Sequence, residues 1–518
     1  MTPEQFSALA EQGFNHIPVT ATVLADFDTP LSSYVKAAVG SYSYLLESAG
    51  QGGDKWARFS MVGLPADQII KVRGHHVTVE QAGEVKEQFE QSDPLAYIES
   101  VLASYRYPDL EDLPIYTGGL VGYFGYDTVR YVEKRVAESE PPDMIGTPDI
   151  LLMVSNDVMV FDNVKGLIHL ITHANPADEH ALDLAHQRLD AMREKLRQPI
   201  PDQFFAGSVG PKLREEDFVS SYGEEVFKAD VDKVKEYILA GDVMQVVLSQ
   251  RMAVKLEASP LDLYRALRSL NPSPYMYYMN LDDFHIVSSS PEILARLDNG
   301  QVTVRPLAGT RRRGVDEAED KALETELLAD PKEIAEHLML IDLGRNDIGK
   351  VCKSGSVEVS EMMIVERYAH VMHIASNVDG EVHDEISAMD VLRATLPVGT
   401  LSGAPKVRAL EIIDELEPAK RGIFGGAVGY LSWNGNMDTA IAIRTAVVKD
   451  GQLYVQAGAG VVADSIPRLE WKETMNKARS IMQAAAMAEN ALQMGGSESS
   501  ASNPRVENPN EARPVVGQ

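Results

Sequence analysis

The chain has 518 residues, of which 44% are hydrophobic and 24% are charged. It has the composition of a globular protein and exceeds the ~100–200 residues of one domain, so we expect two substantial units. Its 48 Lys and Arg residues against 77 Asp and Glu residues give a net charge of −29 at pH 7. Such a charge repels phosphate backbones and anionic lipids, which disfavours nucleic acids and membrane surfaces as partners.

The single cysteine, Cys352, excludes an internal disulfide framework and a cysteine-based zinc site, and it is typical of a reducing compartment. The N-terminus lacks a basic segment followed by an apolar one. No uncharged apolar run approaches the ~20 residues that span a bilayer. We therefore expect a soluble cytoplasmic protein.

The first half of the chain alternates strand-like and turn-like segments. Residues 115–126 and 150–161 are apolar and β-rich, and a polar helix is predicted over roughly 176–197. A linker with two prolines at 198–203 then marks the predicted boundary between an N-terminal region, 1–200, and a second unit, 204–492.

The second unit begins with an amphipathic helix that ends at Gly241, because four apolar residues recur at i, i+4, i+7 and i+11. The four are Phe227, Val231, Val234 and Ile238. Residues 243–254 are predicted to form a buried strand, and a last helix is predicted at about 468–492. Residues 493–518 are rich in Gly, Ser, Asn and Pro without a hydrophobic face, which predicts a disordered tail.

A short internal echo links the two halves. Residues 118–123, GGLVGY, resemble residues 425–430, GGAVGY. The echo predicts similar glycine-rich strands in both halves and leaves open whether the halves arose by duplication.

Two predicted helices carry closely spaced acidic residues. In the first, Asp330 is a candidate N-cap and Pro331 suits the first helical position. Glutamates and neighbouring residues share one face of each helix: Glu333, Glu336 and His337 in the first, and Glu470, Glu473 and Lys477 in the second. Two such helices meeting at a cleft could offer oxygen ligands to Mg²⁺. The alternative is an ordinary solvated ion pair between residues four apart in the second helix.

Three segments suggest recognition of an anion. Residues 309–314, GTRRRG, follow a strand-like segment and are predicted to form a turn that presents amides and guanidinium groups. Residues 456–461, QAGAGV, follow another strand, and their small side chains would let a ligand approach the backbone closely. Arg444 lies in the strand-like run AIAIRTAV and needs a carboxylate partner from the protein or a ligand. The alternatives are a solvated arginine loop and tight sheet packing.

His370 and His373 are three residues apart but lack a third soft ligand nearby, so a catalytic or hydrogen-bonding role is favoured over zinc. The glycine clusters match neither a dinucleotide fingerprint nor a phosphate loop, and no Ser or Cys nucleophile elbow occurs. The residues by themselves predict an enzyme with a site for Mg²⁺ and an anionic substrate.

Taken together, these segments resemble the chorismate-utilising enzymes, and within them the large subunits of anthranilate synthases. The matching segments are LLES at 45–48, NPSPYM at 271–276, SSPE at 289–292, PLAGTRRRG at 306–314, EHLMLIDLGRND at 336–347, HIASNVDG at 373–380, TLSGAPK at 400–406, GGAVGY at 425–430, AIRTAV at 442–447, AGAG at 457–460 and EWKETMNKA at 470–478. The resemblance implies an α+β fold of antiparallel sheets flanked by helices. It makes 204–492 the chorismate-binding catalytic domain.

The resemblance also implies roles for individual residues. Glu336 and Glu473 would hold Mg²⁺, with Glu333 and Glu470 behind them, and Glu292 would be the general acid. Substrate orientation and proton transfer would involve His373, Thr400 and Lys477. The substrate's carboxylates would be bound by Gly309, Thr310, Arg444, Gly458, Ala459 and Gly460. Phe424 replaces the tyrosine usual in the family before GGAVGY, which puts one substrate hydrogen bond of about 1 kcal/mol in doubt.

Two positions distinguish the reactions of the family. Relatives that add water carry a lysine where this chain has Gln245, and those that make 4-amino-4-deoxychorismate carry a lysine where it has Ala308. Both positions imply addition of ammonia: the ring hydroxyl leaves as water, aminodeoxyisochorismate forms, and loss of pyruvate gives anthranilate. Since Cys352 lacks a glycine-flanked elbow, a separate glutamine amidotransferase subunit is expected to supply ammonia in a hetero-oligomer.

LLES and NPSPYM resemble the family's site for feedback inhibition by tryptophan, to be formed by Ser48, Pro274, Tyr275 and Met276. The resemblance therefore favours the first committed enzyme of tryptophan biosynthesis. Its nearest rival is a tryptophan-insensitive synthase of a specialised pathway, such as that of phenazines. Less favoured are a 4-amino-4-deoxychorismate or isochorismate synthase and a protein that only senses chorismate or tryptophan. The presence of Glu292 and His373 disfavours the sensor.

Overall fold

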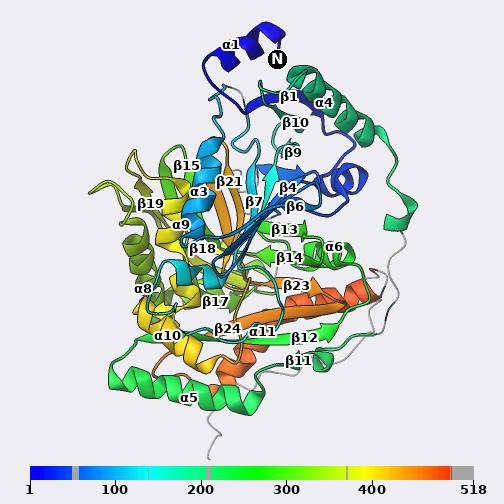
Figure 1. The fold of residues 1–518 in the computed structure, drawn as a ribbon. Coiled ribbons are helices and arrows are strands. Elements are labelled where there is room, and N and C mark those ends of the chain that lie inside the picture. Colours follow the sequence, from blue (N-terminus) through cyan, green and yellow to red (C-terminus); the bar gives the residue numbers. More distant parts are fainter. Residues whose placement is uncertain are drawn as a thin grey trace, which may run out of the picture.

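The computed structural model describes residues 1–49, 58–111, 113–137, 139–205, 210, 212–368, 371–490 and 492. The predicted disordered tail, 493–518, and His370 lie outside the described residues. The strands of the described chain form two large antiparallel sheets with helices on their outer faces (Figure 1). The predicted α+β class is confirmed.

The first sheet, sheet A, contains strands from both halves of the chain. Its order is β1 (Ile17–Leu24), β10 (Leu167–Ala174), β9 (Val158–Asp162), β3 (Phe59–Gly63), β2 (Ser43–Glu47), β13 (Tyr275–Asn280), β14 (Phe284–Ser290), β23 (Thr445–Lys449), β24 (Gln452–Val461), β12 (Gln245–Lys255) and β11 (Val219–Ser220), with β20 (Gly403–Ala404) paired to β12.

The second sheet, sheet B, likewise contains strands from both halves of the chain. Its order is β17 (Leu307–Arg312), β19 (Val371–Glu381), β16 (Gln301–Val304), β15 (Ile293–Asp298), β22 (Met437–Ile441), β21 (Ala427–Ser432), β7 (Gly119–Phe124), β8 (Ile150–Ser155), β4 (Gln68–Arg73), β5 (His76–Gln81) and β6 (Glu84–Glu90), with β18 (Glu358–Arg367) paired to β19.

The two sheets pack face to face. Buried residues of sheet A, such as Tyr277 and Ile286, share one hydrophobic cluster with residues of sheet B, such as Val121 and Met153. Alternating strand residues point to opposite faces, so the outer faces remain to be covered by helices.

The helices form two further hydrophobic clusters on those outer faces. The helices are α1 (Pro3–Glu11), α2 (Pro30–Ser33), α3 (Pro94–Ser104), α4 (Ala181–Arg197), α5 (Glu224–Ala240), α6 (Pro260–Leu270), α7 (Glu317–Ala329), α8 (Pro331–Ile348), α9 (Ala388–Thr395), α10 (Lys406–Leu416) and α11 (Pro467–Glu489), with short helical turns η1 (Tyr34–Ala38), η2 (Tyr126–Tyr131), η3 (Asp202–Phe204), η4 (Glu215–Asp217) and η5 (Gly399–Leu401). Helices α4, α6 and α11 pack on sheet A, and α3, α8 and α9 pack on sheet B. In Figure 1, α1 and α4 lie at one end of the molecule and α5 lies at the other.

Several elements predicted from local patterns are present. Helix α5 ends at Gly241, which adopts the left-handed conformation at φ 85° that favours glycine after a helix. The predicted buried strand is β12, the predicted polar helix is α4 and the last predicted helix is α11. Asp330 caps α8 by accepting hydrogen bonds from the amides of Lys332 and Glu333.

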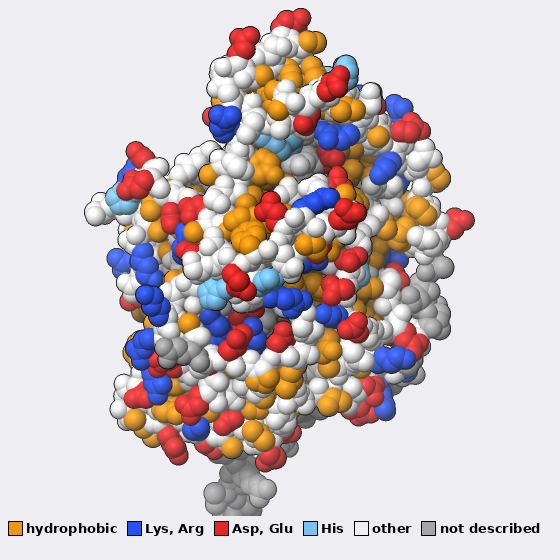
Figure 2. Space-filling model, in the orientation of Figure 1, with side chains coloured by type: hydrophobic (Ala, Val, Ile, Leu, Met, Phe, Trp, Pro, Cys, Tyr) orange, Lys and Arg blue, Asp and Glu red, His pale blue; other side chains and the backbone are white. Residues whose placement is uncertain are grey.

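Strands before and after the predicted boundary at 198–203 belong to the same two sheets. In sheet A, β2 pairs with β13, and in sheet B, β7 pairs with β21. The boundary thus separates segments of sequence that share both sheets. None of the helices in the described residues combines the length and apolarity that a membrane span requires. On the face drawn in Figure 2, acidic and basic side chains are interspersed.

The two glycine-rich echoes lie side by side in sheet B. Gly122 of β7 is opposite Gly429 of β21 in antiparallel register. A Cβ added at Gly122 would lie 2.0 Å from the backbone oxygen of Leu151, and one at Gly429 would lie 2.1 Å from that of Asp438. The shared glycines therefore permit close approach between adjacent strands.

Replacing Gly122 by alanine should destabilise the fold, since the new methyl group meets backbone rather than a movable side chain. We expect a loss of about 1–3 kcal/mol in the free energy of unfolding, measured by urea denaturation. Val85→Ala on the exposed edge strand β6 is the control and should change stability by less than about 0.5 kcal/mol. Equal stability of the parent and Gly122→Ala would contradict the steric argument.

Candidate active site

The candidate site lies where two of the chain's passages between the sheets are adjacent. Strand β14 of sheet A ends at Ser290 and β15 of sheet B begins at Ile293, so Glu292 occupies the first passage. Strand β22 of sheet B ends at Ile441 and β23 of sheet A begins at Thr445, so Arg444 occupies the second. Backbone hydrogen bonds join the passages: the Ser289 amide donates to the Arg444 carbonyl at 3.1 Å, and the Ile441 amide donates to the Glu292 carbonyl at 3.0 Å.

Arg444 was predicted within a strand, and that prediction is wrong. Its φ of 48° places it in the left-handed region, because the chain turns there from one sheet to the other. The side chain forms no ion pair within the described residues. Burial lowers the pKa of Arg444, while the Tyr368 phenol and Glu292 act in the opposite direction. A partly buried guanidinium without an ion pair in the described residues is well placed to receive a carboxylate of a ligand.

Glu292 is 5% exposed, and its Oε1 has no hydrogen-bond partner among the described residues. Burial raises the pKa of Glu292 to about 8, against smaller opposing effects of the Thr400 hydroxyl, the Leu307 amide and the charges of Lys477 and Arg444. The carboxyl group is therefore largely protonated at neutral pH, as a general acid must be.

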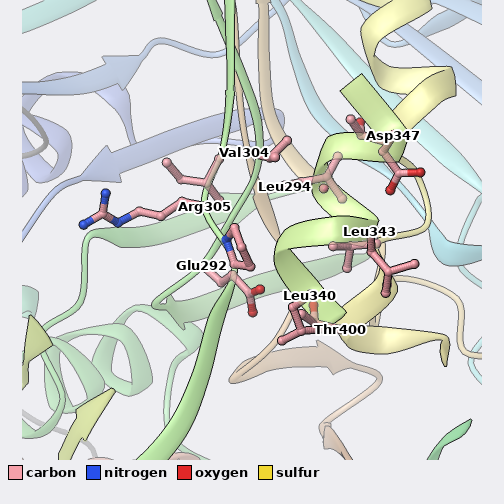
Figure 3. A pocket seen from close by; sticks show the side chains of 14 residues that line it. Glu292, Leu294, Val304, Arg305, Leu340, Leu343, Asp347 and Thr400 are labelled. Carbon is pink, nitrogen blue, oxygen red and sulfur yellow. The ribbon is translucent and has the colours of Figure 1, made fainter. Parts of the chain in front are cut away.

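Figure 3 shows the Glu292 carboxyl group directed toward Leu340 of α8 and Thr400, whereas the Arg305 guanidinium points away. The small cavity beside it has a volume of about 30 Å³. This volume accommodates a water molecule but is far below that of pockets for small organic ligands. The cavity therefore adjoins the acid and is no binding pocket for a ring-sized substrate.

His373 of β19 is buried with a defined tautomer. Its Nδ1 lies 2.8 Å from the carbonyl oxygen of Gly309 and 3.2 Å from the Thr310 hydroxyl. Because a carbonyl only accepts, Nδ1 carries the proton and Nε2 keeps its lone pair. Burial lowers the pKa of His373 to about 4, and the Arg444 charge acts in the same direction. The buried Nε2 has no partner in the described chain and can accept a proton or a hydrogen bond.

Residues 309–312 were predicted to form a turn, but they belong to strand β17, whose pairing with β19 is bulged between Ala308 and Arg311. Gly309 adopts a φ of +63° at this bulge. The bulge brings Gly309 and Thr310 to His373. The three arginines that follow are engaged by acidic residues of α7 and α8. The ion pairs are Arg311 with Glu326, Asp330 and Glu333, Arg312 with Glu319, and Arg313 with Asp320.

The small residues at 456–461 lie inside β24, not after a strand as predicted, and they pair with β12. Gly458 faces Ser249, and Gly460 faces Val247. A Cβ at Gly460 would lie 2.4 Å from Nε2 of Gln245, so glycine is what allows this amide to lie against the strand. Oε1 of Gln245 is buried without a partner in the described residues.

The remaining candidates lie around this strand pair and η5. Lys477 of α11 donates to the carbonyl of Gly458 at 2.9 Å and pairs with Glu473 at 2.8 Å. Thr400 of η5 has a buried hydroxyl without a partner in the described residues. Phe424 is 7% exposed, with the Arg421 guanidinium 5.7 Å from its ring centre. Ala459 is fully buried within β24.

The acidic residues of α8 and α11 influence one another. Burial raises the pKa of Glu336, and the charges of Glu333 and Glu473 raise it further. Burial also raises the pKa of Glu470, with a further contribution from Glu473. Within the described residues, no group of three or more His, Cys, Asp or Glu side chains is arranged to hold a metal ion. The glutamates fit Mg²⁺, which takes one or two protein carboxylates and completes its shell with water and substrate oxygens.

The two segments of the predicted inhibitor site are neighbours in sheet A. Met276 of β13 is opposite Glu47 of β2, and the Ala49 amide donates to the Ser273 carbonyl at 3.0 Å. The Ser48 hydroxyl is buried without a partner in the described residues. Tyr275 donates from its phenol to Asp438 at 2.9 Å, and Pro274 directly precedes β13. Residues 50–57, which follow LLES, lie outside the described residues.

The sequence did not point to Tyr368. Its ring lies edge-on to His373, with 5.5 Å between ring centres, and its phenol affects the pKa of Arg444. The phenol donates to Glu366 at 2.8 Å. No motif marks this tyrosine, and only its position five residues before His373 could have suggested it.

The profile of the chorismate binding enzyme family matches residues 43–483. Among curated proteins, the anthranilate synthase component 1 of Pseudomonas putida is 58% identical over 94% of this chain and 99% of its own length. That of Neisseria meningitidis serogroup B is 53% identical over 95% and 99%. The crystal structure of anthranilate synthase component I from Streptococcus pneumoniae TIGR4 superposes with a TM-score of 0.74 at 42% identity, covering 82% of this chain and 92% of that one. The menaquinone-specific isochorismate synthase of Escherichia coli shares the fold, with a TM-score of 0.68 at 18% identity over 93% of this chain and 98% of that one.

The raised pKa of Glu292 has a consequence for stability. Between its ordinary value of 4.5 and about 8, the folded protein holds a proton that the unfolded chain releases, so stability falls as the pH rises through this range. Glu292→Gln removes this dependence. Relative to the parent, the variant should gain up to about 1.4 kcal/mol per pH unit, measured by urea unfolding at pH 5.5, 7 and 8.5. A stability difference that stays constant with pH would show that Glu292 titrates normally.

Proposed function

The chain belongs to the chorismate binding enzymes and, within them, to the anthranilate synthase component 1 proteins, and on this basis we propose how its residues carry out the reaction. The substrates are chorismate and ammonia, and the products are anthranilate and pyruvate, in the first committed step of tryptophan biosynthesis. One observation carries the proposal of a working site: Glu292, His373, Gln245 and Thr400 each present a buried polar atom without a partner in the described chain. Buried polar groups are normally paired, so these four atoms are available to a ligand.

Glu292 acts as the general acid. Its raised pKa keeps the carboxyl group protonated at neutral pH, and its proton passes to the departing ring hydroxyl, which leaves as water. Thr400, close enough to lower the pKa of Glu292, orients either the acid or the leaving group.

Arg444, Thr310 and the backbone of Gly309 and 458–460 bind the carboxylates of chorismate. Arg444 has no ion pair in the described residues, and the bulge brings Gly309 and Thr310 to His373. Neutral His373 accepts a hydrogen bond or a proton at Nε2 during loss of pyruvate. Lys477, held at the Gly458 carbonyl, orients the substrate from the side of α11.

Glu336 and Glu473 would hold Mg²⁺, with Glu333 and Glu470 behind them. When bound, the ion neutralises the charge of the ring carboxylate and so makes the ring a better electrophile. The negative charges of Glu333 and Glu473 raise the pKa of Glu336, which supports this assignment because a bound cation relieves repulsion between carboxylates. Because the ring hydroxyl and pyruvate are both released by elimination, the enzyme is a lyase.

The nucleophile is ammonia. Neutral Gln245 beside Gly460 offers no base to activate water, and Ala308 offers no amine to attack the ring. Ammonia reaches the site from a glutamine amidotransferase subunit, since Cys352 is buried and packs against Gly380. We place this hetero-oligomer in the cytoplasm, in keeping with a single cysteine and a strongly negative charge.

Tryptophan binds at Ser48, Pro274, Tyr275 and Met276 and inhibits the reaction. The inhibitor segment of β13 pairs directly with the end of β14: Tyr275 is opposite Ser290, two residues before Glu292, and Met276 is opposite Ser289, whose amide binds the Arg444 carbonyl. A shift of β13 on binding would thus displace both the acid and the arginine. The intact inhibitor segments favour this regulated enzyme over a specialised, tryptophan-insensitive one.

The first test is anthranilate fluorescence from the purified chain supplied with chorismate, Mg²⁺ and an ammonium salt at alkaline pH. We expect product that disappears with EDTA, and a loss of about 10²–10⁴-fold in kcat for Glu292→Gln. Consumption of chorismate without anthranilate would indicate isochorismate or aminodeoxychorismate chemistry instead. In Glu336→Gln, loss of turnover with unchanged tryptophan binding would exclude a pure tryptophan sensor.

The second test addresses inhibition. Ser48→Ala removes a buried hydroxyl available to the inhibitor, so the tryptophan concentration for half-inhibition should rise about 5- to 30-fold while kcat without tryptophan stays within twofold of the parent, because a lost hydrogen bond is worth about 1–2 kcal/mol. Ser480→Ala, whose hydroxyl is likewise buried without a partner in the described chain, is the matched control and should leave inhibition unchanged. A parent enzyme indifferent to tryptophan would favour the specialised synthase.

A further inference from the structure

A buried ion pair outside the site just described joins Glu417 and Arg421. The guanidinium donates twice to the carboxylate, from Nη2 to Oε1 at 2.5 Å and from Nε to Oε2 at 2.8 Å. The Arg421 and Glu417 side chains are only 1% and 3% exposed. Such complete burial is costly unless every remaining donor and acceptor is also satisfied.

Two segments that carry active-site residues provide further hydrogen-bond partners for the pair. Nη2 of Arg421 also donates to the Val247 carbonyl at 2.7 Å, and Nη1 donates to the Leu401 carbonyl at 2.5 Å. Oε1 of Glu417 accepts from both the amide and the hydroxyl of Ser249, each at 2.8 Å. Val247 and Ser249 lie in β12 just after Gln245, and Leu401 directly follows Thr400.

The same guanidinium lies over two aromatic rings. It lies 4.6 Å from the ring centre of Tyr126 in η2 and 5.7 Å from that of Phe424. The Tyr126 amide donates to the Gly422 carbonyl at 2.7 Å, and Asp127 accepts from the Gly422 amide at 3.1 Å. The N-terminal half therefore contacts both the guanidinium and the segment that carries it.

The contacts extend to the glycine strand. The Ser249 hydroxyl accepts from Nε2 of Gln456 at 2.8 Å, and Oε1 of Gln456 accepts from Arg251 at 3.1 Å. Arg251 in turn donates to the carbonyls of Lys420 and Arg421. Gln456 lies two residues before Gly458, so β24 is connected to the same pair.

We propose that Glu417 and Arg421 are positioning residues that fix Gln245, Thr400 and Phe424 relative to one another; this inference rests on the function proposed above. The three segments come from β12, η5 and the loop before β21, and the guanidinium is bonded to or stacked on each of them. The planar Arg421 guanidinium forms two hydrogen bonds to Glu417 and one to each of two carbonyl oxygens. A lysine ammonium has only three donors and cannot form these four hydrogen bonds. The pair touches none of the reacting atoms.

The experiment compares Arg421→Lys with Arg130→Lys. Arg130 is a matched control, because it also makes a bidentate ion pair, with Asp414 of α10 at 2.7 and 3.0 Å, and donates to the Val136 carbonyl at 2.6 Å. Its guanidinium also bonds to Asp127 and to the Ser139 carbonyl, but among the described residues it bonds to none of the candidate site residues. Both variants are assayed with saturating chorismate and ammonium at a temperature well below each variant's Tm.

We expect Arg421→Lys to lose about 10- to 100-fold in kcat, the effect of misplacing groups by about 1 Å, and Arg130→Lys to stay within about threefold of the parent. The ratio of anthranilate formed to chorismate consumed should also fall in Arg421→Lys. When Gln245 and Thr400 are misplaced, part of the aminodeoxyisochorismate leaves the site before it loses pyruvate. A loss of folded protein would not change this ratio. Glu417→Gln keeps the shape of the acceptor and should give an intermediate loss if Arg421→Lys does not fold.

Equal kcat and equal product ratio for Arg421→Lys and Arg130→Lys, measured on folded protein, would overturn the positioning role. The same result for Glu417→Gln would overturn it if the lysine variant is unfolded. Failure of the proposed function looks different, since the parent chain itself would then form no anthranilate.

Discussion

The candidate site depends on one constraint of the backbone: two of the passages of the chain between the two sheets, β14 to β15 and β22 to β23, lie at adjacent places. Buried amides and carbonyls must be paired, and at these passages they are paired with each other, Ser289 with Arg444 and Ile441 with Glu292. The two passages are therefore held side by side although they are far apart in the chain. Because residues in the passages have left the regular ladders, an acid and an arginine can face the space where the sheets part.

Burial then sets the chemistry of this space. It favours neutral forms, so the Glu292 carboxyl retains its proton and the His373 imidazole remains uncharged. An acid and a base of opposite pKa shifts can thus coexist at neutral pH within one site. On α8 and α11, by contrast, the negative charges of neighbouring glutamates repel one another, which favours binding of a cation.

The N-terminal half is part of this arrangement and not an appended domain. Strand β2 brings LLES beside the segment 271–276, and β13 pairs in turn with the end of β14. In addition, the Tyr126 ring contacts Arg421 and the Asp127 carboxylate accepts from the Gly422 amide, both in the loop that leads to Phe424. The proposed inhibitor site takes Ser48 from one half and residues 274–276 from the other, and strand pairing joins it to the segment that precedes Glu292.

Several elements follow from local signals in the sequence. The apolar spacing of α5, its glycine end, the Asp330 cap of α8 and the apolar run of β12 each follow from interactions within a few residues. Motif resemblance further identified the candidate residues, but their geometry came from pairing between distant strands. The left-handed turn at Arg444, the bulge at 308–311 and the burial that shifts the pKa of Glu292 depend on which sheet each strand joins. These features could not be predicted from local patterns, because register and burial are set by contacts between residues far apart in the chain.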